Sequence, residues 1–147
     1  MKIAVGSDHR GYPLKEELKR FLKDSNYEVI DQGTFSEESA DYPIYAAKVA
    51  RLVSKGEADK GVLCCGSGIG VSIAANKIKG VRAALVRTAE DAEITVKHNN
   101  SNVICLGRDR TSPEEAIKIL KAFLDAEFEG GRHARRVEQI SKLEEEK

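Results

Sequence analysis

Short apolar segments alternate with amphipathic segments along the chain, and this alternation predicts repeated strand–helix units. The expected strands are short and largely apolar, which is typical of strands buried on both faces of a sheet. They cover residues 2–7, 27–31, 62–65, 81–86 and 103–106. Five such strands with helices between them indicate a parallel sheet that is covered by helices on both faces.

Helical spacing and helix-start signals predict the segments between these strands. After Pro13, apolar residues recur at helical spacing through Leu22, and Ser112-Pro113-Glu114-Glu115 combines a cap, an early proline and an acidic third position. The other expected helices cover 42–55, about 70–78, 88–98, 112 to about 128, and 132–146.

The predicted fold class is α/β, doubly wound and Rossmann-like or flavodoxin-like. It has three αβα layers, a five-stranded parallel sheet and an added C-terminal helix. The 147 residues predict a single domain over 1–147. Right-handed crossovers favour the strand order 2-1-3-4-5. Ligands bind such sheets at the carboxyl ends of strands where the order reverses, here between the first and third strands.

Charge and cysteine usage exclude several classes of partner. Lys+Arg and Asp+Glu are both 24, so the formal net charge is zero and a nucleic-acid partner is not expected. No apolar run reaches membrane-spanning length, and the N-terminus shows no signal-peptide pattern. Three cysteines at no zinc spacing favour a reducing, cytoplasmic location. The three scattered histidines form no metal-ligand pattern, so no metal is expected.

The two strand ends at the expected binding point are followed by Ser7-Asp8-His9-Arg10 and by Gly66-Ser67-Gly68-Ile69-Gly70. Alternating glycines before a helix leave backbone N–H groups unshielded, which favours binding of a phosphate, a carboxylate or an enediolate. The spacing fits neither the dinucleotide fingerprint nor a P-loop. The alternative is a tight strand-to-helix turn that binds nothing.

Cys64 and Cys65 are neighbours on a strand and therefore point to opposite faces of the sheet. Cys65 ends the strand beside the glycine loop, where positive potential favours a thiolate. Packing is the simpler interpretation for Cys64 and Cys105.

Two further polar groups lie late in the chain. His98 closes a helix, where a histidine often only compensates the helix dipole. Arg132 and Arg136 are four residues apart and share one face of the last expected helix, whereas Arg135 is expected to be an ordinary surface charge.

Together these residues resemble the family of ribose-, galactose- and allose-phosphate isomerases, in its type B ribose-5-phosphate branch. The matching segments run nearly end to end in the family's order. They are Gly6-Ser7-Asp8-His9 with Gly11, Asp41-Tyr42-Pro43, Cys65-Gly66-Ser67-Gly68-Ile69-Gly70, Ala74-Ala75-Asn76-Lys77, His98-Asn99-Asn100, and Gly131-Arg132-His133 with Arg136.

The resemblance implies an aldose–ketose isomerase of the pentose phosphate pathway that needs no cofactor and interconverts ribose 5-phosphate and ribulose 5-phosphate. Ring opening would be followed by proton transfer through an enediolate. By similarity Cys65 is the base, because Val71 stands where other members carry an acidic residue. Ser67 and the amides of Gly66, Gly68, Ile69 and Gly70 would stabilise the enediolate.

The resemblance also assigns the remaining roles. His98 would assist ring opening, and Asn99 would hold the intermediate. Asp8, as a further catalytic residue, and Tyr42 would lie near the sugar oxygens. The phosphate would be bound by His9, Arg108, Arg132 and Arg136, with Arg110 as the alternative to Arg108.

A sugar phosphate is thus the expected partner, and a homodimer with shared active sites is the expected assembly, with a tetramer as the larger alternative. Two other functions stay open. One is isomerisation of a hexose 6-phosphate, allose or galactose. The other is a non-catalytic phosphate- or nucleotide-binding module, which would leave Cys65, His98 and Asp8 without a role.

Overall fold

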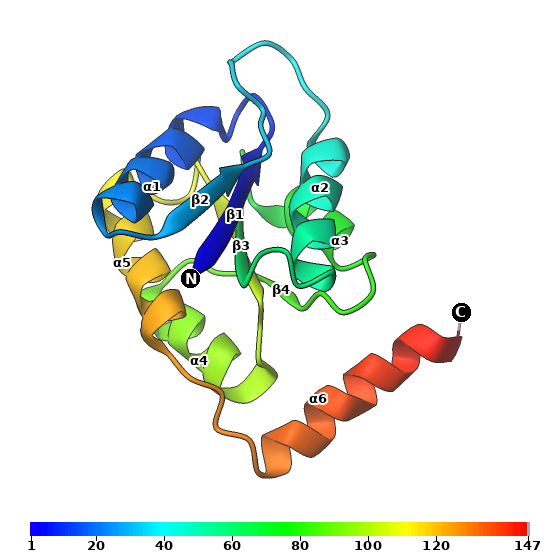
Figure 1. Ribbon diagram of the computed structural model, residues 1–147. Coiled ribbons are helices and arrows are strands. Elements are labelled where there is room, and N and C mark those ends of the chain that lie inside the picture. The colour runs from blue at the N-terminus through cyan, green and yellow to red at the C-terminus, as the bar shows by residue number, and fades with distance from the viewer. Residues whose placement is uncertain (147) are drawn as a thin grey trace.

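Five parallel strands form one sheet, and helices cover both of its faces (Figure 1). The structure is a computed structural model, and it describes residues 1–146. The strands are β1 (Lys2–Ser7), β2 (Glu28–Asp31), β3 (Lys60–Cys65), β4 (Ala83–Leu85) and β5 (Val103–Gly107). The helices are α1 (Tyr12–Asp24), α2 (Tyr42–Ser54), α3 (Ile69–Ala75), α4 (Ala89–Asn99), α5 (Pro113–Asp125), α6 (Arg132–Leu143) and the 3-10 turn η1 (Glu144–Glu146). The predicted α/β class is confirmed.

Successive residues of the central strands belong to two separate hydrophobic cores. In β3, Val62 and Cys64 pack on the side of α1, α4 and α5, whereas Leu63 and Cys65 pack on the side of α2 and α3. Figure 1 shows these two groups of helices on opposite sides of the sheet. The predicted opposite orientation of Cys64 and Cys65 is therefore confirmed.

The strand order is β2-β1-β3-β5-β4, so the predicted order 2-1-3-4-5 is wrong for the last two strands. β5 pairs with both β3 and β4. All of β5 is buried, whereas the short β4 is only half-buried. A fully apolar strand gains most from a central position, and a short strand suits an edge. β1 and β3 remain neighbours, so the predicted crevice between them is kept.

Three helices end about three residues earlier than the sequence pattern predicts, and α2 ends one residue earlier. α5 ends at Asp125 rather than near Phe128, because Ala126 adopts an extended conformation. α3 ends at Ala75, and the Asn76 side chain then bonds both backbone polar groups of Ala83, which redirects the chain toward β4. α6 ends at Leu143 and continues as η1. No described helix is both long and apolar enough to cross a membrane.

Lys15 of α1 is a buried cation that ties the first helix to the end of β2. Its side chain is 1% exposed, and its Nζ lies 2.8 and 2.9 Å from the two carboxylate oxygens of Asp31. Burial alone would raise the pKa of Asp31, but hydrogen bonds from Lys15, from the Gly33 N–H and from Lys19 outweigh it and lower that pKa. A buried charge of this kind is stable only while it keeps its partner.

Replacement of Lys15 by Met is expected to lower the free energy of unfolding by about 2–3 kcal/mol, because Asp31 loses one of its two lysine partners. The pKa of Asp31 is lowered in the folded state, so the ionised carboxylate stabilises the protein above its unfolded pKa, and this contribution is lost as the pH falls through the folded value. Urea unfolding should therefore show the difference between wild type and variant narrowing below about pH 4. The control Lys23→Ala, at an exposed position, should change the free energy of unfolding by less than about 0.5 kcal/mol at any pH. If Lys23→Ala lowered the free energy of unfolding as much as Lys15→Met, this role of Lys15 would be contradicted.

Candidate active site

A cavity of about 550 Å³ opens at the carboxyl ends of β1 and β3. It is bordered by the loop after β1, the first residue of α2, the glycine loop that joins β3 to α3, and the loop after β5. Its lining residues are Asp8, Arg10, Tyr42, Cys65, Gly66, Ser67, Ile69, Gly70, Ile73 and Asp109. Seven of the residues predicted from the sequence therefore meet in one place.

Cys65 is the last residue of β3 and is 5% exposed. Its Sγ accepts a hydrogen bond of 3.1 Å from the Gly68 N–H. Gly68 has a φ of +80°, a left-handed conformation that favours glycine and turns its N–H back toward the sulfur. This hydrogen bond fixes the position of the sulfur at the cavity wall.

The loop after β5 holds the glycine loop in place. The Arg108 N–H donates to the Cys65 carbonyl and the Asp109 N–H donates to the Gly66 carbonyl, each at 2.9 Å. A Cβ on Gly107 would lie 2.5 Å from the carbonyl carbon of Ser67, so only glycine permits this approach. Ser67 Oγ in turn accepts from the Ile69 N–H at 3.2 Å. The loop amides are thus positioned before any ligand binds.

Asp8 and His9 are oriented by the backbone around them. Asp8 is buried, and its Oδ1 accepts from the Gly11 N–H at 2.9 Å. His9 Nδ1 lies 3.1 Å from the backbone nitrogen and 3.2 Å from the carbonyl oxygen of Ala40, so the backbone fixes this side of the ring. Tyr42 begins α2 with its side chain exposed at the cavity. His9 is half-buried beside this group and is not among the lining residues.

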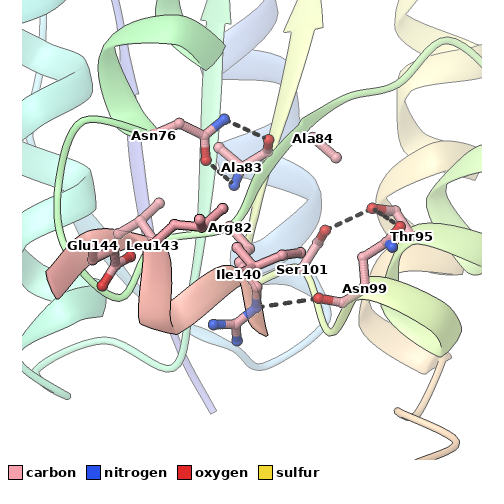
Figure 2. Close-up of a pocket in the computed structure, with 11 residues that line it drawn as sticks. Asn76, Arg82, Ala83, Ala84, Thr95, Asn99, Ser101, Ile140, Leu143 and Glu144 are labelled. Carbon is pink, nitrogen blue, oxygen red and sulfur yellow. Dashed lines mark hydrogen bonds between the residues drawn. The ribbon is translucent and has the colours of Figure 1, made fainter. Parts of the chain in front are cut away.

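Four further predicted site residues lie in another part of the fold. They are His98, Asn99, Arg132 and Arg136. α4 starts beyond the carboxyl end of β4 and runs back, which places His98 and Asn99 toward the amino edge of the sheet (Figure 1). Asn99 lines a separate cavity of about 490 Å³, where Ile140 and Leu143 face Arg82 (Figure 2). Arg132 and Arg136 are exposed on α6, which projects away from the sheet. None of these four predicted residues borders the Cys65 cavity.

His98 and His133 form a stacked pair, with ring centroids 4.3 Å apart and planes 8° from parallel. Glu129 Oε1 lies 3.8 Å from Nε2 of His98 and 3.7 Å from Nε2 of His133. Burial lowers the pKa of His133, and His98 and Arg132 lower it further. These three residues form a potential metal-ligand group. However, the imidazole lone pairs lie in parallel planes and do not converge on one point, so one ring would have to turn before both could bind an ion.

Arg108 and Arg110 both border a third cavity, which lies between α1 and α5. Arg108 is hydrogen-bonded to the start of the glycine loop through its backbone N–H. The sequence interpretation also gave no role to Arg10 or Asp109, although both line the Cys65 cavity. The sequence feature that could have identified Arg10 as a site residue is its position directly after Asp8-His9, in the loop that follows β1.

The fold and the cavity define a doubly wound α/β protein with a thiol and oriented backbone amides at its switch point. The sequence model of the ribose/galactose isomerase family matches residues 3–140. The chain belongs to that family. It is 46% identical over 144 residues to ribose-5-phosphate isomerase B of Escherichia coli, covering 98% of this chain and 97% of that protein.

Solved structures agree with this assignment over nearly the whole chain. A ribose-5-phosphate isomerase B of Clostridium thermocellum has a TM-score of 0.98 and 48% identity, with 99% of each chain covered. A crystal structure of ribose-5-phosphate isomerase B from Mycoplasma genitalium, with bound ribulose-5-phosphate, has a TM-score of 0.95 and 43% identity, covering 99% of this chain and 97% of that one.

The two neighbouring thiols are expected to differ in reactivity. Cys65 borders the cavity, whereas Cys64 and Cys105 are fully buried and burial raises the pKa of both thiols. Iodoacetamide should therefore label Cys65 first in the folded protein, and label Cys64 and Cys105 only after unfolding. Peptide mapping by mass spectrometry measures this, with Cys65→Ser as the control that lacks the early label. Early labelling of Cys64 would contradict the assignment of faces.

Proposed function

We propose that this protein is an enzyme that interconverts ribose 5-phosphate and ribulose 5-phosphate without a cofactor. The observation that carries the proposal is the Cys65 thiol, which lies at the end of a central strand beside the glycine-loop amides in a member of this isomerase family. Relatives that cover nearly the full chain are named for this activity, and one of them binds ribulose 5-phosphate.

Aldose–ketose isomerisation needs a base beside C2 and donors for the oxygen that becomes negative. The Cys65 thiolate takes the C2 proton of the open-chain aldose, and the electron pair moves to form the enediolate. The backbone N–H groups of the glycine loop and Ser67 stabilise the oxyanion. The proton of the C2 hydroxyl passes to the C1 oxygen, the thiol returns the carbon-bound proton to C1, and the C2 oxygen becomes the ketone. Asp8 and Tyr42 hold the sugar oxygens.

A homodimer supplies the groups that one chain leaves at a distance. In the monomer His98, Asn99, Arg132 and Arg136 do not border the Cys65 cavity, and α6 exposes Ile140 and Leu143. A second copy that places α4 and α6 over this cavity would bring His98 for ring opening, Asn99 for the intermediate and two arginines for the phosphate. His9 and Arg108 are the phosphate ligands assigned to the same chain as Cys65. A tetramer would extend this unit, and the three free cysteines fit a cytoplasmic location.

Turnover of ribose 5-phosphate in the presence of a chelator tests the proposal directly. Allose 6-phosphate and galactose 6-phosphate, assayed in parallel, test the two hexose alternatives. A protein that binds sugar phosphates but converts none of them would instead be the non-catalytic module.

Cys65→Ala is expected to lower kcat by about 10²- to 10⁴-fold, because the proton-transferring base is lost. Binding of ribulose 5-phosphate, measured by calorimetry, should persist because the loop amides remain. Cys64→Ala, the matched control on the other face of the sheet, should keep most of its activity. The reverse pattern would show that the base has been assigned to the wrong thiol.

Mixing two impaired variants tests whether the site is shared between subunits. One variant is Cys65→Ala and the other carries Arg132→Ala with Arg136→Ala. If each site combines both chains, random mixed dimers contain one intact site, and the mixture should recover about a quarter of wild-type activity. Arg135→Ala, the control on the same helix, should be nearly as active as wild type. No recovery after verified subunit exchange would mean that each chain builds its own site.

A further inference from the structure

Arg10 is one of the residues that line the Cys65 cavity. It lies two residues after Asp8, and its guanidinium Nη2 donates to Oδ2 of Asp109 in the loop after β5. A Cβ added to Gly66 would lie 2.8 Å from Arg10 Nε and 3.2 Å from Asp109 Oδ2. The Arg10–Asp109 pair therefore lies directly on the glycine loop and joins the loops that follow β1 and β5.

Among residues 1–146, Arg10 is the one basic side chain that lines this cavity. The other proposed phosphate ligands of the same chain are less directly placed. Arg108 borders the cavity between α1 and α5, and His9 is turned toward Ala40 by its Nδ1 contacts. The Arg10 side chain is about half exposed, so an anionic group in the cavity can reach the guanidinium.

The guanidinium keeps unused donors in this position. Its hydrogen bond to Asp109 uses Nη2 alone, which leaves the N–H groups of Nε and Nη1 available. Both side chains of the pair are about half exposed, at 56% and 46%, and ion pairs this exposed are weak enough to be shared with another anion. A planar guanidinium with several N–H groups matches the oxygens of a phosphate.

We propose that Arg10 binds the phosphate group of the sugar-phosphate substrate and that Asp109 acts as a positioning residue, which holds the guanidinium over the glycine loop. The proposal rests on the proposed isomerase function. It adds a phosphate ligand from the same chain as Cys65 to the arginines that a partner would bring. Because Arg10 and Cys65 flank one loop, the bound phosphate sets where the reacting carbons lie relative to the thiol.

Steady-state kinetics of Arg10→Ala with ribose 5-phosphate test this assignment. The KM should rise by about ten- to a hundred-fold, as expected for loss of a charge-assisted hydrogen bond, with kcat changed by less than about three-fold. The inhibition constant of inorganic phosphate should rise by a similar factor, and that of unphosphorylated ribose should not change. Arg10→Lys keeps the positive charge but lacks the planar guanidinium, so its KM should lie between those of wild type and Arg10→Ala. Arg20→Ala, an exposed arginine paired with Glu17 on α1, should behave as wild type.

The role of Asp109 is tested by a double-mutant cycle. Asp109→Ala should raise the KM when Arg10 is present and should add nothing in the Arg10→Ala background. Equal effects in both backgrounds would overturn the positioning role.

Two results would overturn the role of Arg10. One is an unchanged KM and phosphate inhibition, which is expected if the guanidinium is only a surface charge. The other is weaker inhibition by ribose with unchanged inhibition by phosphate, which would place the guanidinium on the sugar oxygens. If the wild type does not convert ribose 5-phosphate, the isomerase proposal fails separately, and calorimetry with inorganic phosphate on wild type and Arg10→Ala still decides the role of Arg10.

Discussion

The close approach of backbone segments at the carboxyl edge of the sheet is the constraint on which the site depends. A Cβ on Gly11 would lie 2.3 Å from the carbonyl carbon of Cys64, and one on Gly107 would lie 2.5 Å from that of Ser67. The loops after β1 and β5 are therefore pressed against the end of β3 and its glycine loop. Backbone hydrogen bonds from Arg108 and Asp109 also join the loop after β5 to the end of β3 and to the glycine loop. Preorganised amides of this kind stabilise charge without reorganising when the charge develops.

This packing also explains which thiol borders the cavity. Because strand residues alternate between faces, Cys64 enters the core beneath α1 and α5, where burial raises the pKa of its thiol. Cys65 faces α2 and α3 and ends the strand where the backbone turns into the loop. The sequence pattern predicted this difference because it depends only on local alternation. The order of the last two strands does not depend on local alternation, and it was predicted wrongly because pairing of β3 with β5 joins segments about 40 residues apart.

The residues of the candidate site likewise fall into those that the sequence could locate and those that it could not. Residues directly after β1 and β3 could be located from the sequence, since the carboxyl ends of neighbouring parallel strands share one edge. His98, Asn99, Arg132 and Arg136 were grouped with them by resemblance, yet the chain places them toward the other end of the molecule. Motifs identify the chemistry of a site, whereas they carry no information on whether two groups meet within a chain or between two copies of it.

Arg10 and Asp109 show a second limit of sequence interpretation. Exposed charges in loops follow no periodic pattern, and most of them are solvated, so neither residue differs from the other 46 charged residues before the fold is known. Their significance comes from a contact over 99 positions in the sequence, directly on a glycine that has no side chain to separate them from the loop. The same glycine-permitted packing that fixes the amides around Cys65 therefore also brings a guanidinium to the cavity. One local constraint thus positions the proposed base, the proposed oxyanion donors and the proposed anion-binding group at one edge of the sheet.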